Sequence, residues 1–407
     1  MRLKSSRMAL TSCAAVTVLF TGACGSDAPT SGAEPTIDLA ALDVGNMPTE
    51  PKFYGKADSI EQAKIVEAWR LANHLPLPSE IMPEVKYEPA TPCAPQIFIS
   101  IYSTAIDCRV KADPAALNGV ATGFVAGFVT TGRSDLSSYL GYELYNLVMI
   151  FSDEKAAADA AQAMGHLDLA ADAANQSVPI PKYPNAVAYT TDDLAGPGQF
   201  WSWYATSKFV IFTRIFDGVM AELKERDLPK LIERVERSID AIAPRVAEFE
   251  ATPPDKLMDL TVDPDAVLAR AVPTVVADQS QNGIPGVYDR RGGLQISPSP
   301  RTDVQLFEET GVDRVAWKGG YVYRTRDSEA AQTFVRSRAT TTRKSPRADS
   351  PANLPDAKCR RTAYSKYDVT YHCVVSYDRY VAEVSADQLL DAQQRIAAQY
   401  AILVNSK

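Results

Sequence analysis

The sequence predicts an α+β fold with two domains, each a mostly antiparallel sheet with helices packed on one face. Three observations support this prediction. The length of 407 residues suits two domains. Each half of the chain carries strand-like and helix-like runs in the order β-α-β-β-β-α. A stretch rich in Pro and Asp, 250–265, separates the two halves.

These features divide the chain into five parts. The boundaries follow the shifts in composition along the sequence. We expect a lipoprotein signal peptide (1–23), a flexible tether (24–38), an N-terminal α+β domain (39–252), a linker and loop-rich connection (253–302) and a C-terminal α+β domain (303–407).

The first residues have the pattern of an export signal. Arg2, Lys4 and Arg7 precede an uncharged, mostly apolar stretch, 8–20, that is too short to span a bilayer. Small residues then lead to Cys24, and this resembles a bacterial lipoprotein signal, although Thr21 stands where Leu is usual. The resemblance implies lipidation of Cys24 and anchoring to the outer face of the cell membrane, in the cell envelope. The alternative is a plain secretory signal with an incidental cysteine.

The elements of the N-terminal domain follow from hydrophobic periodicity and from capping residues. Ser59 and Gln62 form a capping box before a helix at 60–74. Asp153 begins an Ala-rich helix, and a long helix at 219–249 contains Pro229 and Pro244 as boundaries or kinks. Strands are predicted at 96–102, 119–130, 142–152, 186–190, 200–206 and 208–216.

The C-terminal domain repeats this pattern. Asp327-Ser-Glu-Ala-Ala matches Asp153-Glu-Lys-Ala-Ala at the start of a helix, and Ser385 with Gln388 forms a capping box for the last helix. Strands are predicted at 315–324, 359–365, 370–377 and 379–384. We interpret the repeat as an internal duplication; the alternative is that two α+β domains share common patterning.

The cysteines predict disulfides. Besides Cys13 and Cys24, four cysteines remain, and an exported protein meets an oxidising environment. Their spacing favours local pairing, Cys93 with Cys108 and Cys359 with Cys373. The rival interpretation is a metal site, but there is no CxxC motif and the chain has only three histidines. We expect no metal and no other cofactor.

Two groups of residues are candidates for binding. The net charge of −8 argues against a nucleic-acid partner. Aromatic residues are dense across two adjoining predicted strands, and basic residues gather near residue 340, where they could meet anionic headgroups or wall polymers. Core packing and a solvated surface are the respective alternatives. The candidates are Trp201, Trp203 and Tyr204, and Arg336, Arg343 and Arg360.

Several segments carry a family resemblance. They include LDVGNMPTEP, IEQAKIVEAWRLANHL, ATGFVAGFVTTGRS, PPDKLMDLTVDPDAVLARAVP and the ending CVVSYDRYVAEVSADQLLDAQQRIAAQYAIL. These resemble the uncharacterised two-domain lipoproteins of mycobacteria, nocardiae and relatives, which implies an envelope lipoprotein and assigns no functional residue. The C-terminal pattern is also similar to the extracellular sensor domains of actinobacterial serine/threonine kinases, which are disulfide-linked α+β ligand binders.

The sequence contains no GxSxG, HExxH, P-loop or GxGxxG motif, which are common catalytic signatures. We therefore expect a non-catalytic, sensor-like protein that binds an envelope protein, a glycan or a lipid ligand in the groove between its domains. The alternatives are an envelope hydrolase whose catalytic residues assemble only in space and a lipid carrier with an apolar cavity.

Overall fold

A computed structural model describes residues 37–88, 94–193, 196–273, 285–365 and 368–406. Contacts gather Leu39–Lys407 into one compact unit. The predicted signal peptide, Cys24 and Cys93 lie outside the described residues. Within the described part, no helix is long and apolar enough to cross a membrane.

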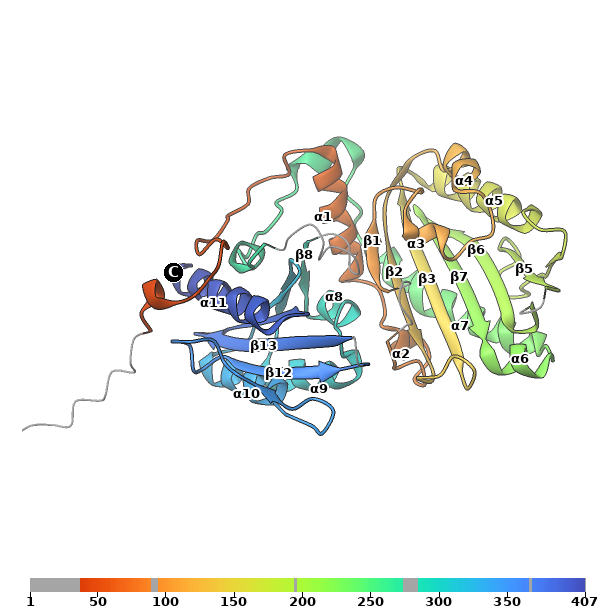
Figure 1. Cartoon of the computed structure of the whole chain (residues 1–407). Coiled ribbons are helices and arrows are strands. Elements are labelled where there is room, and N and C mark those ends of the chain that lie inside the picture. The colour runs from red at the N-terminus through yellow and green to blue at the C-terminus, as the bar shows by residue number, and fades with distance from the viewer. Residues whose placement is uncertain (1–36, 89–93, 194–195, 274–284, 366–367, 407) are drawn as a thin grey trace, which may run out of the picture. The chain divides into compact units, whose positions relative to one another are not determined.

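The N-terminal half forms a seven-stranded antiparallel sheet (Figure 1). Its strand order is β1-β2-β3-β7-β6-β5-β4. The longest strands, β2, β3, β6 and β7, form its centre, and all ten residues of β3 are buried. The strands are β1 (Gln96–Phe98), β2 (Phe124–Arg133), β3 (Tyr142–Phe151), β4 (Asn175–Ser177), β5 (Val187–Thr191), β6 (Gln199–Thr206) and β7 (Phe209–Asp217).

The C-terminal half forms a second seven-stranded antiparallel sheet. Its order is β11-β12-β13-β14-β10-β9-β8. The predicted strand 315–324 is a hairpin of two strands, with Gly319 at positive φ in its turn. The strands are β8 (Gly286–Asp289), β9 (Arg314–Trp317), β10 (Tyr321–Arg324), β11 (Arg347–Ala348), β12 (Lys358–Ala363), β13 (Val369–Tyr377) and β14 (Tyr380–Ala386).

The two sheets have the same topology. Read from opposite ends, their strand orders correspond one to one, from β1 with β8 to β4 with β11. In both halves a helix follows the third strand of the half, and a long helix follows the last. An internal duplication predicts this equivalence, whereas two unrelated α+β domains need not share it.

Helices complete the two halves. Ser59 caps the first helix as predicted, with its Oγ accepting from the Gln62 amide at 3.2 Å. The helices are α1 (Ile60–Ala72), α2 (Pro78–Ile81), α3 (Thr104–Asp107), α4 (Pro114–Val120), α5 (Glu154–Ala170), α6 (Gly218–Leu223), α7 (Leu228–Ala247), α8 (Arg290–Gln295), α9 (Pro300–Thr310), α10 (Ser328–Arg338) and α11 (Leu389–Asn405).

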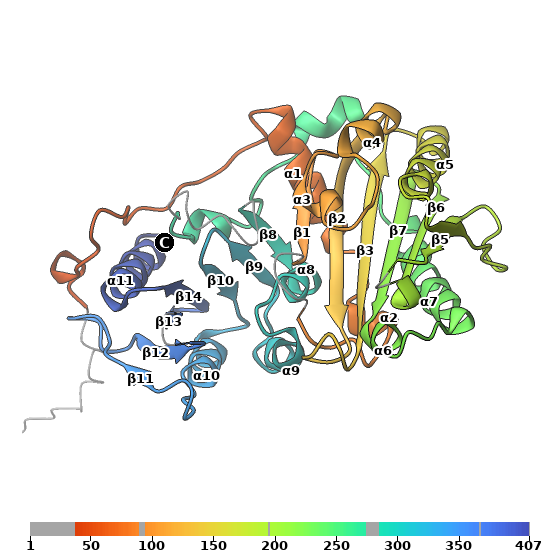
Figure 2. The same cartoon turned by 45° about the vertical axis from the view of Figure 1, so that its right-hand side comes forward.

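Helices cover both faces of each sheet, not one face as we expected. In the first sheet, Val210 and Phe212 of β7 pack in a core with Met164 of α5, while the alternate residue Phe209 contacts Phe249, just after α7. In the second sheet, α10 and α11 lie on opposite sides of β13 and β14 (Figures 1 and 2). Each half is therefore a three-layer arrangement, which explains why the central strands lack polar alternation.

The segment before α1 packs on the C-terminal half. Lys52 donates from its amide to the Ala269 carbonyl at 3.1 Å, and Asn405 Nδ2 of α11 donates to the Thr49 carbonyl at 3.0 Å. The predicted N-terminal domain (39–252) therefore begins with a segment that contacts the C-terminal half, and sequence periodicity carries no signal for such contacts.

Two further expectations differ from the structure. Residues 286–302, which we predicted as part of a loop-rich connection, contain β8, α8 and the start of α9, and β8 pairs with β9. The predicted capping box at Ser385 is wrong, because Ser385 lies in β14 and α11 begins at Leu389 with Gln388 as its N-cap. Ser385 belongs to the strand and does not cap the helix, because it pairs with His372 of β13.

Candidate functional site

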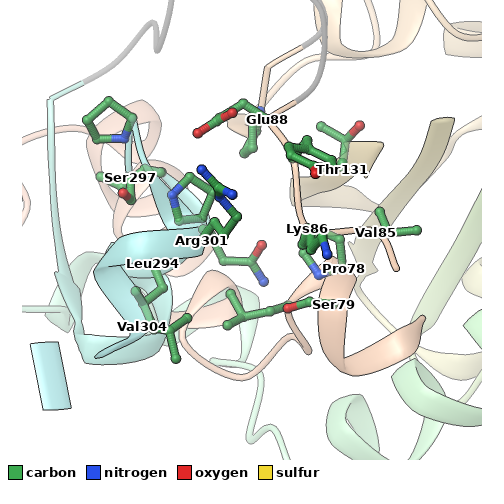
Figure 3. A pocket seen from close by; sticks show the side chains of 18 of the residues that line it. Pro78, Ser79, Val85, Lys86, Glu88, Thr131, Leu294, Ser297, Arg301 and Val304 are labelled. Atoms are coloured by element: carbon green, nitrogen blue, oxygen red, sulfur yellow. The ribbon is translucent and has the colours of Figure 1, made fainter. Parts of the chain in front are cut away.

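A pocket lies where the end of β2 and α2 meet α8 and α9. Its volume is about 460 Å³. Figure 3 shows Leu294, Ser297, Arg301 and Val304 on one side of it and Pro78, Val85, Lys86 and Thr131 on the other. The other lining residues are Leu77, Ser79, Tyr87, Glu88, Ala94, Pro95, Gly132, Gln295, Ile296, Pro298, Pro300 and Tyr321.

The N-terminal wall is built by an extended segment that follows α2. Tyr87 and Arg133 exchange two backbone hydrogen bonds, of 3.1 and 3.0 Å, so residues 85–88 run beside the end of β2. Gly132 lets this segment approach, because a Cβ there would lie 3.0 Å from Val85 Cγ1 and 3.1 Å from Pro78 Cβ. The wall is therefore tied to a central strand.

The C-terminal wall is the connection between α8 and α9. Asp303 of α9 is fully buried and accepts a hydrogen bond from the Ser297 hydroxyl, while Arg338 of α10 donates to both Asp303 carboxylate oxygens, at 2.8 and 2.7 Å. The Tyr321 hydroxyl donates to the Ile296 carbonyl at 2.8 Å. These bonds hold residues 296–299 in one conformation beside the pocket.

Gln295 joins the two walls. Its Nε2 donates to the carbonyls of Leu75 and Pro76, at 3.3 and 3.0 Å, and its Oε1 accepts from the Thr130 hydroxyl of β2 at 2.8 Å. Gln295 is only 4% exposed, so all of these bonds are buried. Because an unsatisfied buried amide is costly, this residue fixes α8 against β2 and the segment between α1 and α2.

The pocket surface is mostly apolar, with a few polar groups. Lys86 and Arg301 both approach the Tyr87 ring, with 5.7 and 5.6 Å from the cationic group to the ring centroid. Neither forms an ion pair among the described residues. The Thr131 hydroxyl is buried and has no hydrogen-bond partner in the part of the chain that the structure describes. This surface suits a ligand with an apolar body and a polar or anionic end.

The tryptophans that the sequence predicts as part of a binding surface lie in the hydrophobic core. Trp201 and Trp203 are at most 2% exposed and pack in the cluster under α5. Trp201 Nε1 donates to the Arg109 carbonyl, and Trp203 Nε1 donates to Asp168 Oδ2, both at 3.0 Å. Tyr204 is half-buried against the Tyr183 ring. A second helical layer covers this face, so the tryptophans are not available to a partner at the surface.

The predicted basic residues divide into two groups. Arg336 and Arg343 are exposed, and Arg360 is half-buried, with its Nη1 donating to the Ser345 hydroxyl at 3.1 Å. Arg338, two residues from Arg336, instead points inward to Asp303. None of the three candidate arginines lines the pocket described above.

One histidine contacts a serine. His372 Nδ1 lies 2.8 Å from Ser385 Oγ. A catalytic triad needs a carboxylate that stabilises the imidazolium. Here burial and the neighbouring Arg360 guanidinium lower the pKa of His372 to about 4, which disfavours the imidazolium. No cluster of metal-ligating side chains occurs among the described residues.

The disulfide between Cys359 and Cys373 is confirmed. The two residues face each other in the register of β12 and β13, with Cα atoms 4.1 Å apart. Cys93 lies outside the described residues, so its pairing with Cys108 stays a prediction.

Sequence reasoning missed the pocket residues. They come from short turns and helix ends between residues 77 and 321, and none belongs to a motif. The Pro-rich runs LPLP at 75–78 and SPSP at 297–300 were their only local signal. Those runs mark breaks between elements and do not show that the breaks meet in space.

Two family descriptions match the chain. Residues 54–262 match "Domain of unknown function (DUF7373) N-terminal", and residues 267–406 match the corresponding C-terminal domain. Comparisons with curated proteins and with solved structures gave no match. The N-terminal match ends at residue 262, and the C-terminal match begins at residue 267.

Proposed function

The chain belongs to the DUF7373 family, whose description assigns no activity, and we propose from its own geometry that it is a membrane-anchored lipoprotein of the cell envelope that binds a small ligand without catalysis. The ligand lies in the pocket between α2, the end of β2, α8 and α9. The predicted lipid on Cys24 supplies the anchor.

The apolar surface of this pocket is the observation that carries the proposal. Its volume of about 460 Å³ falls within the range of small-molecule sites, roughly 300–1,000 Å³. Gln295 ties the two walls together by buried hydrogen bonds, so the pocket exists before a ligand binds. A preformed apolar cavity favours binding because little ordering of the protein is required.

The polar groups at the pocket favour an amphipathic ligand. Lys86 and Arg301 are exposed cations and Glu88 is the acidic residue beside them, so the charged lining residues carry one net positive charge. A single anionic or polar end would lie near these side chains, with the apolar body against Leu77, Val85 and Leu294. A lipid carrier is the second candidate, because the same apolar lining would hold an acyl chain.

Titration of the purified chain with anilinonaphthalene sulfonate, an apolar fluorescent anion, tests the pocket. We expect saturable binding at one site. Val304→Trp should reduce affinity at least tenfold, because Val304 lines the pocket and the indole would fill it. Val219→Trp is the matched control, since both valines are 39% exposed and Val219 lies on α6, outside the pocket.

Equal probe affinity in the two tryptophan variants would contradict the pocket as the ligand site. If the chain transfers the bound probe to acceptor vesicles when it collides with them, a lipid carrier is favoured. A binding protein would retain its ligand. The anchor is tested separately by palmitate labelling of cells that express the chain or its Cys24→Ala variant. Crosslinking in intact cells would then identify an envelope protein or glycan partner.

A further inference from the structure

Basic side chains are concentrated around the β11–β12 hairpin. Residues 336–361 contain eight basic and two acidic residues, in a chain whose net charge is −8. We use "basic surface" for six of them: Arg336, Arg343, Lys344, Arg347, Arg360 and Arg361. All are exposed except Arg360, which is half-buried.

The fold brings these residues together. Arg347 of β11 faces Arg360 of β12 directly in the strand register, and the Arg361 amide donates to the Pro346 carbonyl at 2.9 Å. Arg343 and Lys344 lie in the turn between α10 and β11, where Thr342 and Ser345 pair. In Figure 2, α10, β11 and β12 lie together at one end of the second sheet.

In the part of the chain that the structure describes, no carboxylate forms an ion pair with the basic surface. None of its six members forms an ion pair among the described residues, whereas Arg338, Arg324 and Arg314 in the same domain all pair with aspartates. Like charges opposite each other on adjacent strands are destabilising. Arg336 lies in the last turn of α10, where the helix dipole accounts for it, but the other five have no such role. Their arrangement is therefore suited to an external anion.

The start of the folded part contacts the loop of the β11–β12 hairpin, whose strands carry Arg347 and Arg360. The Ala41 carbonyl accepts a hydrogen bond of 2.7 Å from Asn353 Nδ2, and Asn353 lies in the loop between β11 and β12. Only residues 24–38 separate the predicted lipid on Cys24 from Leu39. An extended chain of that length spans at most about 50 Å. A lipid on Cys24 would therefore keep the basic surface close to the bilayer.

We propose that the basic surface binds the anionic lipid headgroups of the membrane to which the chain is anchored, and so orients the folded part against the bilayer. The choice of membrane over a soluble polyanion rests on the anchor proposed above. The lipid would attach the chain to the membrane, and the arginines would orient the folded part against it. Each basic residue at an anionic membrane surface contributes about a fivefold increase in partitioning.

Vesicle binding of the full chain carrying Cys24→Ala tests the surface without the lipid. The readout is the ratio of binding to phosphatidylglycerol-containing vesicles over pure phosphatidylcholine vesicles, because any apolar insertion contributes to both. We expect Arg343→Gln, Arg347→Gln and Arg361→Gln together to lower this ratio by roughly 100-fold, and added salt to lower it in the parent chain. The matched control removes three exposed lysines elsewhere: Lys155→Gln, Lys230→Gln and Lys256→Gln.

Equal ratios for the two triple variants would overturn the proposal, as would tight binding of polyphosphate without preference for anionic vesicles. Thermal melting of both variants checks whether they remain folded. Palmitate labelling reports separately on the anchor, so loss of headgroup binding and absence of the lipid are distinguishable results.

Discussion

Asp153 and Asp327 occupy equivalent positions in the two halves of the molecule. Each is the N-cap of the helix that follows the third strand of its half, and each accepts a 2.8 Å hydrogen bond from the amide three residues later, of Ala156 and Ala330. Their φ angles, −155° and −157°, are nearly the same. The shared cap, together with the matching strand orders, supports an internal duplication.

The first prediction concerns these caps. Asp153→Ala and Asp327→Ala should each lower the melting temperature by about 2–4 °C, because an N-cap carboxylate satisfies an otherwise unpaired helix amide. Asp153→Asn and Asp327→Asn should retain most of the stability, since Asn also caps. Differential scanning calorimetry measures all four. A loss in only one half would argue against equivalent roles.

The sequence predicts the strands and the repeat well because their signals are local. Asp153-Glu-Lys-Ala-Ala and Asp327-Ser-Glu-Ala-Ala both combine a capping residue with helix formers, and both begin helices where expected. The hairpin turns at Ser207 and Asp378 likewise match the predicted breaks between strands. Helix starts and hairpin turns depend on neighbouring residues, so they can be predicted from a single sequence.

The helices on both faces of each sheet and the position of the pocket could not be predicted from local signals. Trp201 and Trp203 alternate with Phe200 and Ser202, which suggests one exposed face, but α5 on one side and α7 on the other bury both. In the sequence RRGGLQ, Gln295 has no feature that marks it as a buried residue. Its role is shown only by its hydrogen bond with Thr130, which lies 165 residues away in sequence. Long-range contacts leave no periodic signal in a single sequence.

The second prediction concerns Gln295. Gln295→Ala should cost about 1–3 kcal/mol of unfolding free energy, because the Thr130 hydroxyl and the Pro76 carbonyl then lose a buried partner. It should also weaken binding of the fluorescent anion, since the two walls are no longer joined. Urea unfolding and the probe titration measure the two effects.

Gln162→Ala is the control for Gln295. Gln162 Nε2 also donates to a backbone carbonyl, that of Asn185, at 2.7 Å, but at the exposed surface. Its loss should change the unfolding free energy by less than about 0.5 kcal/mol. Similar losses in the two variants would show that Gln295 does not have the buried bridging role.

The third prediction concerns the ion pair between Asp303 and Arg338. The Asp303 side chain is fully buried and that of Arg338 is 10% exposed, so Arg338→Met leaves an uncompensated buried carboxylate. The expected loss is about 3–5 kcal/mol in urea unfolding. The double variant with Asp303→Leu should recover part of it, because it removes one buried carboxylate, whereas Glu383, whose Oε2 lies 3.1 Å from Arg338 Nε, remains buried and loses its partner. A double variant no more stable than Arg338→Met would contradict this account.

The fourth prediction concerns pH. Burial, and then Arg360, lower the pKa of His372 to about 4, below the unfolded value of 6.5. The folded state therefore favours neutral imidazole, so this contribution to stability is complete above pH 6.5 and is lost as the pH falls from 6.5 towards 4. The loss is roughly 2–3 kcal/mol. Unfolding of the parent chain and of His372→Gln across this range measures it, with the variant less sensitive to acid. Arg360→Gln should raise the pKa of His372 in an NMR titration, and a parent value near 6.5 would show that neither burial nor Arg360 acts on this ring.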